Sequence, residues 1–166
     1  MSARHVLFLC TGNSARSILA EALLAHHGGE RFMSSSAGSQ PKGVPHPVAL
    51  ETLERHGLRS TGYRSKSWNE FGAAGATPVD IVITVCDSAA AETCPIWPGH
   101  PASVHWGIPD PAAVTSSTDA QRAAFEATYQ TLDARIRKLV AVPERQLEPD
   151  QVRGALAAIA DAVPAS

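Results

Sequence analysis

The chain has 166 residues, of which 44% are hydrophobic and 18% are charged, and its formal net charge is -2. This length suits one globular domain with a buried core, and the near-neutral charge excludes the bulk attraction to nucleic acid that strongly basic proteins show. The apolar run near the N-terminus is too short to span a membrane, and three cysteines fit a disulfide framework poorly. We therefore expect a cytoplasmic protein with reactive thiols and neither a nucleic-acid nor a membrane partner.

The first predicted element is a strand buried on both faces. Residues 5–9 (HVLFL) form a continuous apolar run, and apolar residues then recur with helical spacing over residues 14–27. The segment 10–16 is therefore a turn that leads from a strand into a helix. A weaker second strand is predicted over residues 32–36, and a second helix over residues 47–56.

The clearest strand lies over residues 79–85 (VDIVITV), because it is apolar, rich in β-branched side chains and ends at Cys86. The segment before it, residues 59–78, carries several glycines and is predicted to be mostly irregular, with one short helix. A fourth short strand is predicted over residues 103–106, followed by a proline-flanked loop, GIPDP, over residues 107–111.

Two helices are predicted near the C-terminus. A long helix begins at the capping residues Thr118 and Asp119 and ends at Pro143, and a second amphipathic helix lies within residues 144–166. Alternating strands and helices predict an α/β fold with an open, mainly four-stranded parallel sheet flanked by helices and an extra C-terminal helix. We expect residues 1–143 to form the main domain and residues 144–166 a C-terminal helical extension.

The turn after the first strand carries residues for oxyanion chemistry. A thiol, Cys10, and a guanidinium, Arg16, lie six residues apart in the sequence CTGNSARS. Free backbone N–H groups of the turn and of the first helical turn converge on an anion, and an arginine grips two oxygens at once. The predicted oxyanion-binding residues are Thr11, Gly12, Asn13, Ser14, Ala15 and Arg16.

The same surroundings are expected to act on the Cys10 thiol. A thiol beside a cation at a helix N-terminus loses its proton readily, so we expect its pKa to lie roughly 2 to 4 units below the usual value. Ser17 is placed to donate a hydrogen bond to this thiolate, and Asn13 to hold the shape of the loop. The alternative is a buried cysteine without a chemical role, but the strand and helix on either side of the loop favour an active site.

On these residues the sequence resembles the low-molecular-weight tyrosine phosphatase superfamily, whose signature is a cysteine-to-arginine loop followed by serine. Within the superfamily it is more similar to the arsenate reductases, which are cytoplasmic oxidoreductases of arsenical resistance with a redox-active disulfide. The resemblance extends from Val6 to about Val142 and depends on residues 6–17, 36–39, 80–86, 94–99 and 105–111.

The resemblance implies roles for three further residues. Asp110, held between two prolines, matches the general acid that protonates the departing oxygen. Cys86 and Cys94 match the second and third cysteines of the thioredoxin-linked arsenate reductases. Cys86 is expected to reduce an arsenic adduct on Cys10 by forming a disulfide, which Cys94 then carries outward. Arsenate, or a phosphate-like oxyanion, is the implied substrate, and no resident cofactor is expected.

Two departures from the thioredoxin-linked pattern leave the reductant open. Cys86 and Cys94 are separated by seven residues, one more than in that pattern, and Ala15 stands where many relatives have another cysteine. The electron donor is thioredoxin, glutaredoxin with glutathione, or a low-molecular-weight thiol such as mycothiol.

A potassium site of some relatives is matched only in part. Asn13, Glu21 and Ser36 correspond to it by position, but the region of its remaining carboxylate holds Lys66, whose ammonium is expected to replace the ion. We therefore predict no required metal. A zinc site is disfavoured, because no close cysteine pair is present among its candidate ligands, Cys86, Cys94, His100 and His105.

Three functions are compatible with the sequence. The leading hypothesis is a thiol-dependent arsenate reductase. The alternative is a phosphatase that hydrolyses phosphomonoesters through a phosphoenzyme on Cys10, although no tyrosine follows Asp110 before Tyr129, and this absence favours a small inorganic substrate over an aryl phosphate. A sensor that binds an oxyanion without turnover is the third, and the acid at Asp110 argues against it. Trp97 and Trp106 are expected either to line the substrate site or to pack in the core.

Overall fold

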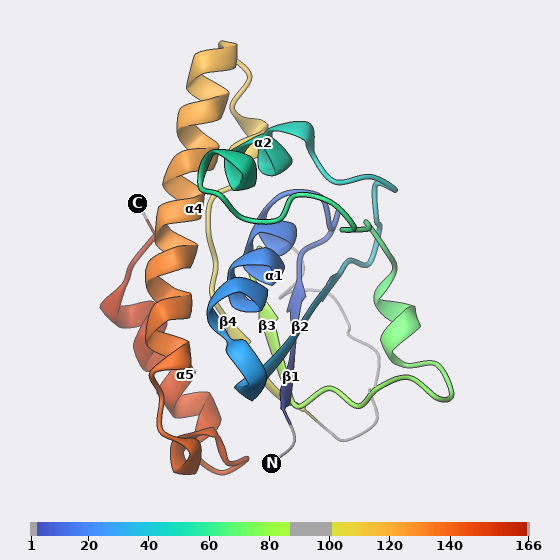
Figure 1. The fold of residues 1–166 in the computed structure, drawn as a ribbon, viewed down its shortest axis with the longest axis vertical. Coiled ribbons are helices and arrows are strands. Elements are labelled where there is room, and N and C mark those ends of the chain that lie inside the picture. Colours follow the sequence, from blue (N-terminus) through green and yellow to red (C-terminus); the bar gives the residue numbers. More distant parts are fainter. Residues whose placement is uncertain (1–2, 87–100, 166) are drawn as a thin grey trace.

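The computed structural model describes residues 3–86 and 101–165, and its centre is a four-stranded parallel sheet (Figure 1). The strands lie in the order β2-β1-β3-β4, and every neighbouring pair is parallel. This arrangement confirms the predicted α/β fold. The strands are β1 (Arg4–Leu9), β2 (Phe32–Ala37), β3 (Ile81–Thr84) and β4 (Ala102–His105).

The central strand β1 is almost wholly buried, as its apolar run predicts. It pairs with β2 on one side and β3 on the other, so that Val6 lies opposite both Ser34 and Ile81. The one ionisable side chain in the run, His5, is buried with both ring nitrogens in hydrogen bonds, to Pro78 O at 3.0 Å and Ser35 Oγ at 2.8 Å. These partners offset the cost of removing the imidazole from water.

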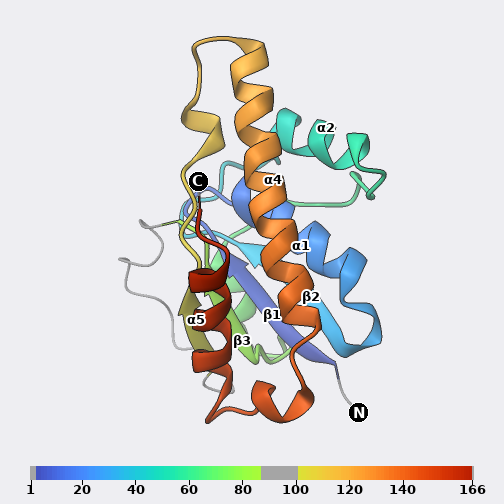
Figure 2. The same cartoon turned by 90° about the vertical axis from the view of Figure 1, so that its left-hand side faces the viewer.

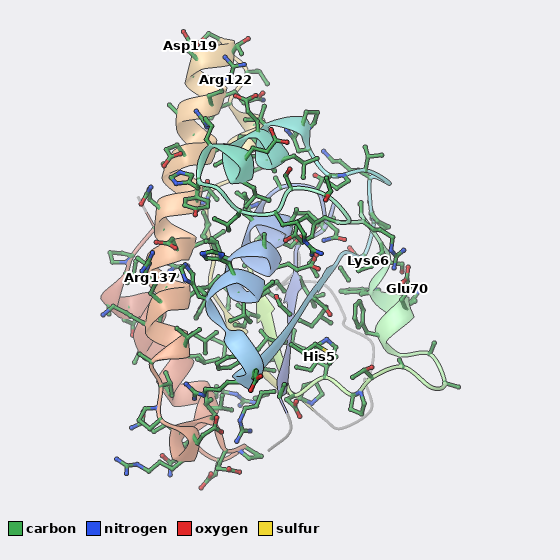
Figure 3. All side chains as sticks on the ribbon, viewed as in Figure 1. His5, Lys66, Glu70, Asp119, Arg122 and Arg137 are labelled. Atoms are coloured by element: carbon green, nitrogen blue, oxygen red, sulfur yellow. The ribbon has the colours of Figure 1, made fainter. Side chains whose placement is uncertain are left out.

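In residues 3–86 and 101–165, four α-helices pack around the sheet (Figures 1 and 2). Helix α1 packs on β1 and β2, the long helix α4 lies along α1, and α2 packs across α4. An ion pair of Arg122 Nε with Glu51 Oε1, 2.7 Å apart, joins the N-terminal part of α4 to α2 (Figure 3). The helices are α1 (Arg16–His27), α2 (Pro47–Arg55), α4 (Thr118–Val140) and α5 (Val152–Ala162).

The predicted C-terminal helix is present as α5, which lies against β4 and α4 (Figure 2). Its apolar face is formed by Val152, Leu156 and Ile159, all of which are buried in the main core. The indole of Trp106 donates from Nε1 to the Leu156 carbonyl oxygen at 2.9 Å. Trp106 therefore belongs to the core, which is one of the two roles expected for it. Trp97 lies outside the described residues.

The loops at the carboxyl ends of β1, β3 and β4 meet at one edge of the sheet. Hydrogen bonds between backbone groups join them: Val85 N donates to Leu9 O, and Ile108 N donates to Val85 O. Short 3-10 helices, among them Trp68–Phe71 and Pro111–Ala113, occur in the connections, and the first confirms the short helix expected there. No helix in the described part of the chain has the length and hydropathy needed to cross a membrane.

Candidate active site

Four predicted site residues meet at the carboxyl edge of the sheet. Cys10 follows β1 directly, Arg16 opens α1, Cys86 comes shortly after β3, and Asp110 lies in the loop after β4. This is where open parallel sheets generally bind ligands, because successive loops converge there. The remaining predicted thiol, Cys94, lies outside the described residues.

The loop from Thr11 to Ser14 is held from outside by residues 40–46, which we call the clamp segment. Three backbone N–H groups of the clamp segment donate to loop carbonyls: Gln40 N to Thr11 O at 3.0 Å, Lys42 N to Gly12 O at 3.0 Å and His46 N to Ser14 O at 2.8 Å. The C=O and N–H of a trans peptide point in opposite directions. The N–H groups of the same peptides therefore face away from the clamp segment. On the inner side of the loop, the Gly12 N–H acts to lower the pKa of the Cys10 thiol.

Asn13 fixes the tightest point of the loop. It is fully buried and has a φ of 43°, in the left-handed region that asparagine tolerates better than most residues. Its Nδ2 donates to Ser17 Oγ at 2.8 Å and Ser36 Oγ at 2.9 Å, and its Oδ1 accepts from Lys66 N at 2.9 Å. The whole side-chain amide is thus used to hold the loop, as expected for Asn13.

Arg16 reaches from α1 across to the loop after β4. Its Nη1 donates to Ile108 O at 2.7 Å, and its Nη2 lies 3.8 Å from Asp110 Oδ2. The side chain is only 13% exposed, yet its Nε is buried and has no hydrogen-bond partner in the part of the chain that the structure describes. A buried guanidinium donor left unpaired is costly, and an oxyanion held by the loop amides is a suitable acceptor for it.

Asp110 lies where a proton donor can reach the site from solvent. Its side chain is 44% exposed, and its Oδ1 accepts from Ala112 N at 3.0 Å, which caps the short helix Pro111–Ala113. The other carboxylate oxygen, Oδ2, is directed toward Arg16. The proline-flanked turn therefore presents one oxygen of Asp110 to Arg16.

The two described thiols lie against each other at the oxyanion loop. Cys10 is 6% and Cys86 is 3% exposed, so both thiols are buried at the loop. The sulfur of Cys86 also accepts from Thr11 N at 3.3 Å and lies 3.7 Å from Thr11 Oγ1. The structure thus brings the second cysteine to the loop itself.

The expected lowering of the Cys10 pKa is wrong for this arrangement. The hydrogen bond to Cys86 and burial raise the pKa of the Cys10 thiol above its ordinary value, and the nearby charge of Arg16 and the Gly12 N–H oppose that rise only in part. The sequence prediction considered the cation and the helix N-terminus but not a second buried thiol in contact with the first.

Ser17 is fully buried beneath the loop. Its hydroxyl oxygen accepts from Asn13 Nδ2, so its own proton remains to be donated. Its predicted hydrogen bond to a Cys10 thiolate stays a prediction.

A mostly buried ion pair lies behind the loop, where the sequence suggested that Lys66 replaces a potassium ion. Lys66 Nζ is 4.0 Å from Glu21 Oε1, and Ser36 Oγ donates to the same carboxylate oxygen. Burial raises the pKa of Glu21 and lowers that of Lys66. Since an ammonium and a hydroxyl donor already serve this carboxylate oxygen, the residues do not fit a potassium ion. Figure 3 places Lys66 beside Glu70, far from α4.

Sequence reasoning missed two parts of the site. The clamp segment acts through backbone N–H groups, which no side-chain pattern reveals. The Ile108 carbonyl, which accepts from Arg16, is likewise a backbone group.

Among residues 3–86 and 101–165, no group of three or more His, Cys, Asp or Glu side chains is placed to hold a metal ion.

Comparisons with known proteins agree with this geometry. Residues 5–152 match the family model of the low molecular weight phosphotyrosine protein phosphatases. An arsenate reductase of Bacillus licheniformis is 32% identical over 144 residues, which are 87% of this chain and 100% of the relative.

Two solved structures are also similar. One is an arsenate reductase in the phosphate binding state, at 26% identity and a TM-score of 0.66, covering 83% of this chain and 97% of that chain. The other is a thioredoxin-dependent arsenate reductase of Corynebacterium glutamicum, at 27% identity and a TM-score of 0.59, covering 90% of this chain and 64% of that chain.

Proposed function

This chain belongs to the low molecular weight phosphotyrosine protein phosphatase family, and we propose that it is a thiol-dependent arsenate reductase that converts arsenate to arsenite. One observation carries the proposal: two buried thiols, Cys10 and Cys86, lie at one oxyanion loop, where the Cys86 sulfur accepts from Thr11 N. Hydrolysis of a phosphate ester at such a loop needs one thiol, whereas reduction of arsenate needs two. The similarity to proteins named arsenate reductase supports the same choice.

In the first step, Cys10 attacks the arsenic of a bound arsenate. Arg16 and the loop amides of residues 11–16 hold the oxyanion and stabilise the negative charge on its oxygens. A sulfur–arsenic bond forms and an arsenic–oxygen bond breaks, and Asp110 gives its proton to the departing oxygen, which leaves as water. Ser17 donates a hydrogen bond to the Cys10 sulfur while that sulfur carries charge.

In the second step, the Cys86 thiolate attacks the Cys10 sulfur. A disulfide forms, the sulfur–arsenic bond breaks, and its electron pair remains on arsenic, which leaves as arsenite. Two thiols have then lost two electrons and arsenic has gained two. The Cys86 sulfur lies 3.3 Å from the backbone nitrogen of Thr11, the residue next to Cys10, which supports this step, since disulfide exchange requires close approach of the sulfurs.

The third cysteine regenerates the nucleophile. Cys94 attacks the Cys86 sulfur, which frees Cys10 and moves the disulfide to Cys86 and Cys94. An external dithiol then reduces that pair. The similarity to a thioredoxin-dependent enzyme favours thioredoxin over glutaredoxin or a low-molecular-weight thiol, and we place the reaction in the cytoplasm, where such reductants keep thiols reduced.

Coupled turnover tests the proposal. The purified chain is mixed with arsenate, thioredoxin, thioredoxin reductase and NADPH, and NADPH oxidation is followed; mycothiol or glutathione with its redoxin replaces thioredoxin in parallel. We expect multiple turnovers with one donor and none in Cys10→Ser or Cys86→Ser. No turnover with any donor, together with rapid hydrolysis of an aryl phosphate, would instead establish the phosphatase alternative.

The same experiment excludes the sensor. A protein that only binds the oxyanion would show at most one equivalent of NADPH consumed per chain. Mass spectrometry after a single turnover without reductant identifies the trapped disulfide, and we expect Cys10–Cys86 in Cys94→Ser and Cys86–Cys94 in the unaltered chain.

A further inference from the structure

We infer that Lys42 is a specificity-determining residue of this site, because its ammonium is held beside the oxyanion loop and favours doubly charged oxyanions over singly charged and neutral ones. The inference rests on the proposed function, since it concerns the arsenate that the loop is proposed to bind. It gives the clamp segment a role through a side chain, in addition to its backbone N–H groups.

The backbone of Lys42 is fixed against the loop. Its N–H donates to Gly12 O at 3.0 Å, and the next residue, Gly43, donates from its N–H to Ser65 Oγ at 3.1 Å. Ser65 Oγ donates in turn to the same Gly12 O at 3.1 Å. Two hydrogen bonds therefore converge on one loop carbonyl and hold Lys42 at the loop.

The side chain of Lys42 lies along Gly12. Its Cγ, Cδ and Cε atoms are 3.4, 3.5 and 3.2 Å from the position that a Cβ atom on Gly12 would occupy. The missing side chain of Gly12 is what leaves room for this stem. Since Nζ is one bond of about 1.5 Å beyond Cε, it lies within about 5 Å of the same position. The charge is thus held near the loop although Lys42 is exposed.

An anion in the loop lies within the range of this charge. The Gly12 N–H is one of the loop amides proposed to hold the anion, and an ordinary hydrogen bond from it spans about 2.9 Å. An anion oxygen bound there is within about 10 Å of Lys42 Nζ, which is about one Debye length at 0.1 M salt. The ammonium therefore acts on the anion through space and needs no direct contact.

The charged groups nearby leave the Lys42 ammonium available to an anion. Lys42 makes no ion pair with any of residues 3–86 and 101–165. The charges of Lys42 and Asp110 act in opposite directions on the pKa of His46, so both lie within range of that ring. Asp110 Oδ2 is directed toward Arg16 at 3.8 Å. Two cations and one carboxylate thus surround the loop, and this balance favours an anion.

Arsenate and arsenite differ in charge, so the ammonium acts on them differently. Arsenate is mostly doubly charged at neutral pH, whereas arsenite is an uncharged acid. Coulomb attraction to Lys42 doubles from a singly to a doubly charged anion and is absent for a neutral molecule. Lys42 therefore strengthens the binding of the substrate without retaining the product.

The binding of anions that cannot be reduced by thiols tests the inference. Isothermal titration calorimetry at neutral pH and low salt compares sulfate, which is doubly charged, with methanesulfonate, which is singly charged, in the unaltered chain, Lys42→Met and Lys42→Arg. We expect Lys42→Met to lose about threefold or more in sulfate affinity and less in methanesulfonate affinity. Lys42→Arg should stay within about twofold of the unaltered chain, and added sodium chloride should reduce the loss in Lys42→Met.

Lys138→Met is the matched control, because it removes an exposed lysine far from the loop. Lys138 lies in the last turn of α4, where Val140 O accepts from Arg31 Nη1, and Arg31 directly precedes β2. This end of α4 is therefore near the amino ends of the strands, and sulfate affinity should be unchanged. An unchanged sulfate affinity in Lys42→Met, an equal proportional loss for both anions, or the same loss in Lys138→Met or Lys42→Arg would overturn the inference.

Kinetics separate this inference from the proposed function. In arsenate reduction we expect Lys42→Met to raise KM about threefold and to leave kcat within about twofold, because the charge acts on binding. If sulfate binding responds to Lys42 but the unaltered chain fails to reduce arsenate, the reductase assignment falls and the role of Lys42 stands. If arsenate is reduced and Lys42→Met changes neither KM nor sulfate affinity, only the role of Lys42 falls.

Discussion

Gly38 directly follows β2 and lies against the oxyanion loop. A Cβ atom there would lie less than 3.0 Å from the carbonyl oxygens of Cys10 and Thr11, and both are backbone atoms that cannot turn aside. In Gly38→Ala we expect the loop to be displaced, with at least roughly a hundredfold loss of kcat/KM for arsenate, because catalysis is sensitive to shifts of about 1 Å. Steady-state kinetics and the affinity for phosphate as an inhibitor measure the effect.

Gly154→Ala is the control for the loss of a glycine. Gly154 lies within α5, and a Cβ atom added there would meet no other atom within 4 Å. Alanine should therefore stabilise the helix by up to about 1 kcal/mol and leave kcat/KM unchanged. Normal kinetics in Gly38→Ala would show that the contact with the loop is unimportant.

The charge and burial of Lys66 lead to a prediction about stability. Its ammonium faces the buried Glu21 carboxylate, so Lys66→Met leaves that carboxylate without its cation. Breaking a buried ion pair in this way costs about 3 to 5 kcal/mol. We expect a clear fall in the melting temperature, measured by calorimetry, and partial recovery in potassium chloride relative to choline chloride. The unaltered chain should melt equally in both salts.

Lys138→Met serves as the control, because Lys138 lies exposed on α4. Its melting temperature should change little, as is usual for surface positions. A similar response in both variants would mean that Lys66 does not supply a structural charge.

At the scale of elements, α2 is coupled to the oxyanion loop through its first residues. The cap of α2 is His46, whose Nδ1 accepts from Val48 N at 3.1 Å, while its backbone N–H donates to Ser14 O. Burial and the charge of Lys42 hold the pKa of His46 below its ordinary value of 6.5, and Asp110 opposes them. The lowered pKa means that folding favours the neutral ring, because a protonated Nδ1 cannot accept the capping hydrogen bond.

The sign of the pH effect follows from that preference. The stability contributed by His46 is fully present above the unfolded-state pKa of about 6.5 and is lost as the pH falls through the lower folded-state pKa. In His46→Ala we expect a loss of about 1 kcal/mol at pH 8 and a weaker dependence of stability on pH between 7 and 5. Urea unfolding at several pH values measures both quantities.

His46→Asn should restore the cap without a titrating group. Asparagine is among the preferred cap residues, so this variant should match the unaltered chain at pH 8 and exceed it at pH 5. If the free energy of unfolding depends on pH equally in all three proteins, titration of His46 does not contribute to stability in acid.

Elements with strong periodicity were predicted well from the sequence. The apolar runs determined β1 and β3 because a strand buried on both faces admits little else, and the structure places them at residues 4–9 and 81–84. The meeting of Cys10, Cys86 and Asp110 also followed, because the carboxyl ends of parallel strands share one edge.

Contacts that depend on exact backbone position were not predicted. The clamp segment satisfies three loop carbonyls with N–H groups that any residue except proline could supply. Cys86 and burial raise the pKa of Cys10 instead of lowering it, and a pattern of residue types does not report how two buried thiols are placed. Helix ends were displaced by one or two residues, as at α2, which ends at Arg55 and not at position 56.

At the scale of the whole molecule, α5 is part of the structure that supports the active site. The loop after β4 passes Trp106 on its way to Asp110, and Trp106 is enclosed by α5. The buried Arg135 guanidinium of α4 joins the same region, since it donates to Trp106 O at 3.1 Å and to Val163 O at 2.9 Å. The packing therefore argues that residues 144–166, expected from the sequence to be an extension, fold together with residues 1–143.

A chain that ends at Pro143 tests this view. Removal of α5 would uncover Trp106, which donates to Leu156 O, and leave the Arg135 Nε without its carbonyl partner. Losing several buried side chains of a marginally stable domain is enough to unfold it. We expect the shortened chain to lack a cooperative melting transition and to show the Trp106 fluorescence of a solvated indole.

Leu156→Ala in the full chain gives a graded version of the same measurement. Leu156 is fully buried, so its truncation should cost about 2 to 5 kcal/mol while α5 stays in place. Ala157→Ser, at an exposed position on the same helix, should cost well under about 1 kcal/mol. A shortened chain that melts cooperatively near the temperature of the full chain and reduces arsenate would instead establish a domain boundary at residue 143, because the site would then need nothing from α5.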